Sequence, residues 1–195
     1  PGQHFIVAAG ALGSCCSDTA VAGTFMHELG HTLGLSHGGF TAGGQMNHTG
    51  YKPNYLSVMN YLFQLSGLVG TNELNYSEYA LPSLDENNLD ERVGIDPEGL
   101  TAGTGLGSKF RRRSLFNRHP EHIVQSIAGT SVDFNGNNTV DSEPLSMNIN
   151  GDTDENKKDI KSVLTSSTDW DHLDFRGGNI GQKYVYLQGV QVPED

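Results

Sequence analysis

The chain has 195 residues, of which 35% are hydrophobic and 18% charged, and its formal net charge at pH 7 is −11. This length fits one ordinary domain or two small ones, and the composition is typical of a globular protein. The negative charge argues against a nucleic-acid partner, because binding to phosphates requires a basic face. No apolar run approaches the length of a membrane-spanning helix, so we expect no membrane span.

The first predicted element is a strand over residues 4–9, whose central residues include β-branched side chains. A single strand cannot bury its apolar face alone, so this strand needs others beside it. Two adjacent cysteines, Cys15 and Cys16, follow and are the only cysteines of the chain. Neighbouring cysteines rarely bond to each other. They either pair with partners in a preceding segment, as in a secreted protein, or stay free thiols.

A helix is predicted from about Val21 to Leu33, with Asp18 or Thr19 near its start. His27 and His31 lie four positions apart within it, so both can face one metal ion from the same side of the helix. Glu28 follows the first histidine but is rotated by about 100° around the helix axis. Its carboxylate can therefore reach a metal-bound water without binding the metal.

A third histidine, His37, could not reach the same ion if the helix continued, because it would lie about 9 Å further along the axis. Gly34 stands where the chain must turn, and glycine readily adopts the left-handed conformation that ends many helices. Three histidines plus water form the open coordination of catalytic zinc, whereas a structural site is closed by four protein ligands. Zinc lowers the pKa of its water from 15.7 to about 7. Glu28 can then take the proton and pass it to a leaving amine.

The pattern H-E-x-x-H-x-x-G-x-x-H from His27 to His37 is the metzincin signature, and the sequence Ser-Val-Met-Asn-Tyr follows at residues 57–61. Over about residues 20–62 the chain resembles the metzincin zinc endopeptidases. The resemblance implies that Met59 lies beneath the zinc as a hydrophobic floor. A core methionine would be the ordinary interpretation, and the two roles are compatible.

The resemblance also concerns Tyr61, two residues after the methionine. In the astacin and serralysin branches a tyrosine at this place binds zinc or stabilises the tetrahedral intermediate. The alternative is an aromatic side chain packed beside Leu62 and Phe63. Gly38, which follows the third histidine, matches neither branch, so the branch stays open.

The fold that the resemblance implies is an α+β, zincin-like catalytic domain. Metzincins have a sheet of several strands and a helix before the zinc helix, whereas only residues 1–26 precede His27 here. We expect part of this N-terminal sheet to be supplied by a preceding segment or by another chain; the alternative is a compact variant without it. We place the catalytic core at residues 1–100 and a loop-rich C-terminal region at residues 101–195.

Three further segments carry local signals. Residues 38–56 are rich in Gly, Asn, Thr and Pro and are predicted as a loop with an exposed His48. A short helix is expected from Ser83, as its N-cap, to about Arg92, because acidic residues occupy its first turn. The basic run at residues 109–113 is predicted as an exposed loop, with a cleavage-prone site as the alternative.

Two polar segments of the C-terminal region place oxygen-bearing side chains at alternate positions, as calcium-binding loops do. The first fills positions 1, 3, 5, 7 and 9 of an EF-hand-type loop, but Pro144 stands where the bidentate glutamate belongs. The alternative is a pair of polar turns that need no ion. The candidate calcium ligands are Asp133, Asn135, Asn137, Thr139 and Asp141 in the first segment and Asn148, Asn150, Asp152 and Asp154 in the second.

Together these patterns predict a secreted zinc endopeptidase that acts on a protein or peptide substrate, with calcium as a second candidate metal. One alternative is a calcium-stabilised extracellular binding or structural module with a residual zinc site. Another is a zinc hydrolase that acts on something other than a peptide.

Overall fold

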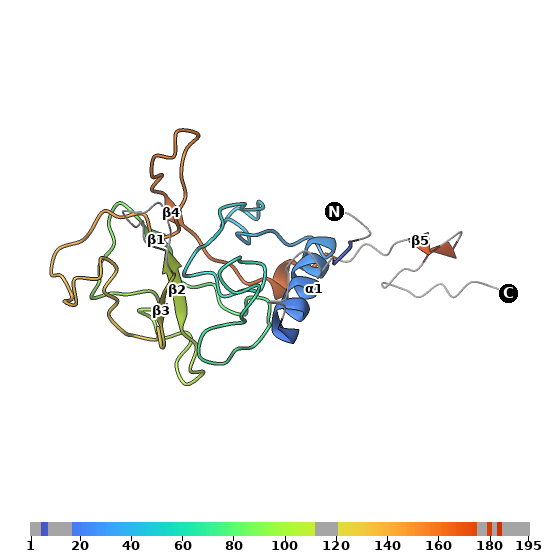
Figure 1. Ribbon diagram of the computed structural model, residues 1–195, viewed down its shortest axis with the longest axis horizontal. Helices are drawn as coiled ribbons and strands as arrows, with labels where there is room; N and C mark the ends of the chain where they lie inside the picture. Colours follow the sequence, from blue (N-terminus) through green and yellow to red (C-terminus); the bar gives the residue numbers. More distant parts are fainter. Residues whose placement is uncertain (1–4, 8–16, 112–120, 175–178, 181–182, 185–195) are drawn as a thin grey trace.

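The computed structural model describes residues 5–7, 17–111, 121–174, 179–180 and 183–184. Most of this chain runs in turns and loops around few regular elements (Figure 1). Among the described residues, no helix combines the length and the apolarity that crossing a membrane requires. The elements are the helix α1 (Asp18–Thr32), the strands β1 (Leu84–Asp85), β2 (Ser108–Arg111), β3 (Glu121–Val124) and β4 (Val163–Leu164), the 3-10 helix η2 (Trp170–His172), and the strands β5 (Asn179–Ile180) and β6 (Lys183–Tyr184).

Helix α1 begins slightly earlier than predicted, because Ser17 acts as its N-cap. The Ser17 hydroxyl accepts a hydrogen bond from the backbone N–H of Ala20 at 3.2 Å. Asp18 in the first turn adds a favourable interaction with the helix dipole. The N-cap residue, Ser17, therefore lies just before Asp18 and Thr19, the residues expected near the start of the helix.

The C-terminal end of α1 is formed by Gly34, as predicted. Gly34 has a φ of +90°, and its N–H bonds to the carbonyl of His31 at 3.2 Å. The N–H of Leu35 reaches back to the carbonyl of Gly30 at 2.9 Å. These two bonds make a Schellman motif, which ends the helix and redirects the chain toward His37.

The strands form three antiparallel pairs among the described residues: β1 with β4, β2 with β3, and β5 with β6. In the first pair Leu84 lies opposite Leu164, and in the second Ser108 lies opposite Val124. The pair β1–β4 joins residues on opposite sides of residue 100. The predicted boundary between the catalytic core and the C-terminal region stays a prediction, and the pairing of β1 with β4 crosses it.

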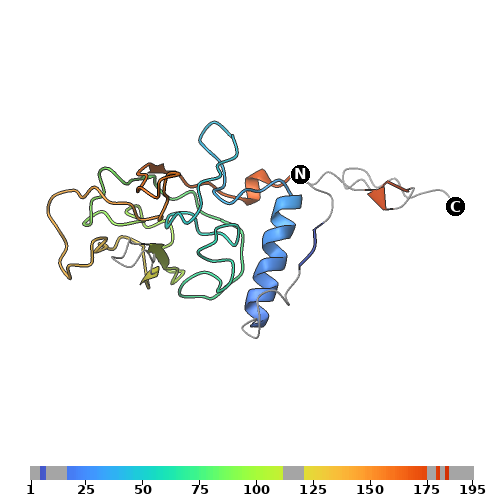
Figure 2. The ribbon, with the colours of Figure 1, turned by 45° about the horizontal axis from the view of Figure 1, so that its top comes forward.

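Two hydrophobic clusters form the core. The larger one extends along the chain from Leu56 to Leu164 and includes three fully buried or nearly buried phenylalanines, Phe63, Phe110 and Phe134. The smaller one lies against α1, which stands at the edge of the main body (Figure 2). Its buried members are Leu35, Phe40, Tyr55, Val58, Met59 and Tyr76.

The helix predicted from Ser83 to Arg92 is wrong: this stretch holds strand β1 and then turns. The side chain of Asp85 accepts a hydrogen bond from the N–H of Asn87 at 2.9 Å, and that of Asp90 accepts one from the N–H of Arg92 at 3.0 Å. Such local bonds from aspartate to the backbone stabilise turns and compete with the helix.

The predicted exposure of the basic run is also wrong for its described part, which forms β2. Lys109 and Phe110 are buried. The ammonium of Lys109 donates to the hydroxyl of Ser66 at 2.8 Å and lies 3.3 Å from the carboxylate of Glu121. The carboxylate of Glu121, in β3, therefore compensates the buried charge of Lys109. Residues 112–113 lie outside the described residues.

The predicted strand at residues 4–9 and the predicted loop at residues 38–56 have different outcomes. Residues 5–7 form no strand, and the other residues of the predicted strand 4–9 lie outside the described part, as do Cys15 and Cys16. The loop at 38–56 is confirmed, with one isolated bridge between Phe40 and Met46.

Candidate metal centre

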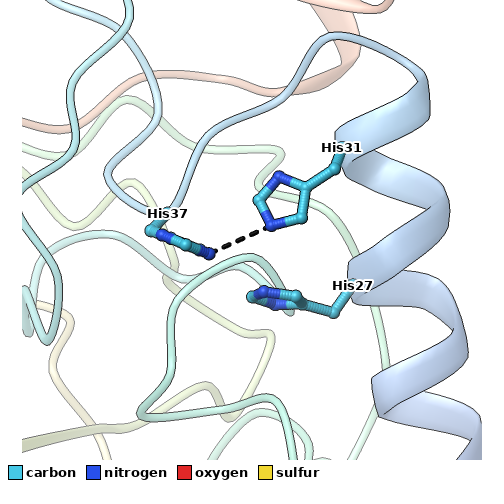
Figure 3. Close-up of side chains that lie close together, drawn as sticks. All are labelled: His27, His31 and His37. Carbon is cyan, nitrogen blue, oxygen red and sulfur yellow. Dashed lines mark hydrogen bonds between the residues drawn. The ribbon is translucent and has the colours of Figure 1, made fainter. Parts of the chain in front are cut away.

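The three histidines of the sequence pattern converge on one point. His27 and His31 project from α1, and His37 approaches from the loop that follows Gly34 (Figure 3). One ring nitrogen from each histidine lies within 4.8 Å of the others. The Nε2 atoms of His31 and His37 are 3.0 Å apart. Among the described residues, this is the only group of three His, Cys, Asp or Glu side chains close enough to hold one ion.

Backbone carbonyls orient two of the rings. Nδ1 of His27 lies 2.9 Å from the carbonyl oxygen of Val58, and Nδ1 of His31 lies 3.1 Å from that of Leu35. A carbonyl can only accept, so each Nδ1 carries the hydrogen and donates it. Each Nε2 then keeps its lone pair for a metal, which is the usual arrangement around histidine ligands.

The surroundings also favour the neutral imidazoles that metals require. Burial lowers the pKa of His27. Burial and the nearby His31, His27 and His48 lower the pKa of His37 to about 4. Neutral imidazole is the form that binds metal, and three such donors suit zinc. The residues present therefore fit a zinc ion.

Met59 packs against the helix turn that carries the histidines. Its side chain is completely buried. A Cβ added at Gly30, which precedes His31, would overlap the sulfur of Met59. The absence of a side chain at Gly30 thus lets the methionine lie directly against α1. Its place beneath a zinc ion stays a prediction.

Tyr61 lies beside the trio of His27, His31 and His37. Its hydroxyl is 3.0 Å from Nε2 of His37, and its ring stacks on that of His27 at a centroid distance of 5.4 Å. Its exposed fraction is 38%, so the ring borders solvent. Burial and the charges of Tyr51 and Glu28 raise the pKa of Tyr61, which keeps the phenol protonated and able to donate.

Glu28 is half-buried on α1, next to His27. Its charge acts to raise the pKa of both His27 and Tyr61. The carboxylate is therefore within electrostatic reach of the ring nitrogens and of the phenol. The candidate base thus lies close enough to His27 and to the candidate oxyanion donor, Tyr61, to act on both electrostatically.

A cavity adjoins the trio. Ser36 donates its only hydroxyl hydrogen to the carbonyl of Asn47 at 2.9 Å, so the contact of 2.9 Å with Nδ1 of His48 has the histidine as donor. His48 is exposed, as predicted, yet it belongs to the wall of the cavity. The cavity has a volume of about 330 Å³ and is lined by His31, Gly34, Leu35, Ser36, His37, Met46 and His48.

Lys52 links the loop of His37 to the C-terminal region. Its side chain is completely buried, and its ammonium donates to the carbonyl of Gly38 at 2.5 Å and to that of Thr165. Burial lowers the pKa of Lys52 from 10.5 to about 8, although Asp169 acts in the opposite direction. Sequence analysis did not identify this lysine, because its partners lie far away in the chain.

The lowered pKa of Lys52 predicts a pH-dependent stability. Between pH 8 and 10.5 the unfolded chain binds a proton that the folded chain releases, so the free energy of unfolding rises with pH in this window, by roughly 3 kcal/mol in total from this group. Lys52→Met lacks this contribution. Urea unfolding of both proteins at pH 8, 9 and 10 should show the wild-type gaining stability relative to the variant. Parallel profiles would contradict the assignment.

The two candidate calcium segments use their oxygens in internal hydrogen bonds. The carboxylate of Asp133 accepts from the N–H groups of Asn137 at 3.2 Å and Asn138 at 2.8 Å. Asp141 accepts from the amide of Asn135 at 2.6 Å, and Asn150 accepts from the N–H of Asp152 at 2.9 Å. These bonds describe polar turns, and calcium at either segment stays a prediction.

Comparison of the chain with known protein families, with curated proteins and with solved structures finds no match. A functional assignment therefore depends on the geometry and chemistry of the chain's own residues.

Proposed function

We propose that the chain belongs to a secreted zinc endopeptidase of the metzincin type. The observation that carries this proposal is the convergence of His27, His31 and His37. The hydroxyl of Tyr61 lies 3.0 Å from Nε2 of His37, and Glu28 follows His27 on α1. Three protein ligands are the set that catalytic zinc sites use, because such sites keep a further position for water or substrate.

Each side chain has a role that its position supports. When bound, zinc supplies the Lewis acidity that makes a water nucleophilic at neutral pH. Glu28 would act as general base toward the attacking water and as general acid toward the leaving amine. Tyr61 remains a phenol because its pKa is raised, and it donates a hydrogen bond to the oxygen that gains charge at the scissile carbonyl. His27 is held in the required tautomer by the carbonyl of Val58.

The cavity beside the three histidines offers room for a side chain of a peptide substrate. It borders His31 and His37, so a side chain next to the scissile bond would enter it. Leu35 and Met46 give it apolar walls, which favours an apolar residue of a peptide.

A purified chain loaded with one equivalent of zinc tests the proposal against a broad protein substrate such as casein. We expect hydrolysis of internal peptide bonds, its loss on chelation, and its return when zinc is added back. Hydrolysis of esters but not of peptides would favour the non-peptide hydrolase. Zinc binding and calcium-dependent stability without any hydrolysis would favour the calcium-stabilised module with a residual zinc site.

A further inference from the structure

A buried carboxylate from the C-terminal region lies behind the turn that contains Met59. Asp169, just before η2, has no exposed surface. Its Oδ1 accepts a hydrogen bond from the hydroxyl of Tyr55 at 2.6 Å. Its Oδ2 accepts from the hydroxyl of Ser57 at 2.5 Å and from the N–H of Ser77 at 2.8 Å. Both oxygens are therefore used to hold the segment that precedes Met59.

The same turn forms one side of the metal centre. The hydroxyl of Ser57 that donates to Asp169 also accepts from the N–H of Met59 at 3.0 Å. The intervening residue, Val58, offers the carbonyl that fixes the ring of His27. A displacement of this turn would move that carbonyl and the methionine together.

The rest of this C-terminal segment fastens the loop of His37 and the end of α1. The hydroxyl of Ser167 accepts from the N–H of Phe40 at 2.9 Å, and the ring of His172 stacks on Phe40 at 4.1 Å. The N–H of Asp174 donates to the carbonyl of Leu33 at 2.8 Å. Figure 2 shows η2 beside the C-terminal end of α1. The segment thus contacts each backbone element that carries part of the trio.

A carboxylate is the group that this place requires. Three donors point at it, and an ionised carboxyl group is an acceptor only. An asparagine has an NH₂ group in place of one of the two oxygens, and this group cannot accept a hydrogen bond from the donors that face it. Burying a charge is costly unless the charge is hydrogen-bonded. The three hydrogen bonds of Asp169 offset this cost, and they also hold the turn of Ser57 and Val58 in place.

We propose that Asp169 is a positioning residue of the metal centre: by fixing the turn of Ser57 and Val58 it sets the orientation of His27. This inference rests on the proposed zinc site, and it extends that site to a residue far outside the 1–100 region expected to contain it. Asp169 acts through the backbone and does not contact the metal.

The test compares Asp169→Asn with a matched control, Asp96→Asn. Asp96 is likewise completely buried, and it accepts one hydrogen bond on Oδ1, from Leu100, and two on Oδ2, both from Thr101. Both variants lose a comparable set of bonds and should have a lowered melting temperature. Only Asp169 is connected to the turn beneath the histidines.

We expect the zinc dissociation constant of Asp169→Asn to rise about 10-fold, the lower end of the effect of residues that orient metal ligands. We also expect an altered visible absorption spectrum of the cobalt-substituted protein. Asp96→Asn should keep the wild-type constant and spectrum. Equal zinc affinity and equal spectra in the two variants would overturn the proposal, because a merely structural role affects both in the same way.

A milder variant, Tyr55→Phe, removes one of the three bonds and keeps the carboxylate. Should Asp169→Asn not fold, a raised zinc dissociation constant in Tyr55→Phe supports the proposal, and an unchanged constant and spectrum overturns it. A wild-type protein that binds zinc without cleaving peptides rejects the peptidase but leaves this comparison valid. If the wild-type protein cleaves peptides and Asp169→Asn keeps the wild-type zinc dissociation constant and cobalt spectrum, the positioning role alone is rejected.

Discussion

Replacing Glu28 with glutamine is expected to lower kcat/KM for peptide hydrolysis by about 10²- to 10⁴-fold, the range that general acid–base catalysis contributes. Glutamine keeps the size and a polar oxygen but cannot accept the proton of the attacking water. Steady-state cleavage of a fluorogenic peptide, with both proteins loaded with one equivalent of zinc, measures the loss.

The zinc content separates this effect from damage to the metal site. Glu28→Gln should bind zinc as the wild-type protein does, since the carboxylate is not one of the three ligands. An exposed glutamate elsewhere, Glu98, provides the matched control, and Glu98→Gln should keep full activity. Equal activity of Glu28→Gln and wild-type would remove Glu28 from the mechanism.

The candidate metal centre was predictable to the extent that it is local. The spacing of His27, His31 and His37 and the position of Gly34 are set within one helix and one turn, where helix geometry decides which side chains meet. The place of Met59 beneath the metal was predicted only from the resemblance to the metzincins, and it stays a prediction. Each of these expectations concerns residues that are near one another in the chain or belong to a short pattern.

The supporting residues were not predictable, because their partners are distant. Asp169 bonds to Tyr55, 114 positions earlier, and Lys52 bonds to Thr165 across 113 positions. No periodicity or spacing encodes such pairs. They arise only when the C-terminal region packs behind the histidine loop, which also buries charges that composition alone assigns to the surface.

The incorrect local predictions have the same origin. The acidic stretch after Ser83 has the composition of a helix start, but the carboxylate of Glu86 is buried and accepts from the N–H groups of Ile149 at 2.7 Å and Ser162 at 2.9 Å. Lys109 is likewise drawn into β2 by its pairing with Glu121. Long-range hydrogen bonds of this kind override local preference.

Replacing His37 with alanine is expected to raise the zinc dissociation constant by more than the 10- to 100-fold typical of changes in residues that merely orient ligands, because it removes a ligand itself. Peptide hydrolysis should fall to the level of the chelated protein. Competition with a chelator of known affinity measures the constant.

His48→Ala is the matched control, since this exposed histidine lies on the same loop and in the wall of the same cavity but outside the trio. It should keep the wild-type zinc stoichiometry, because its Nδ1 donates to Ser36 and the group of side chains close enough to hold one ion does not include it. If the His37 variant held zinc as tightly as the His48 variant, the ion would have to bind without the residue that Gly34 turns toward α1. The three-histidine site, and with it the open coordination position on which hydrolysis depends, would then be wrong.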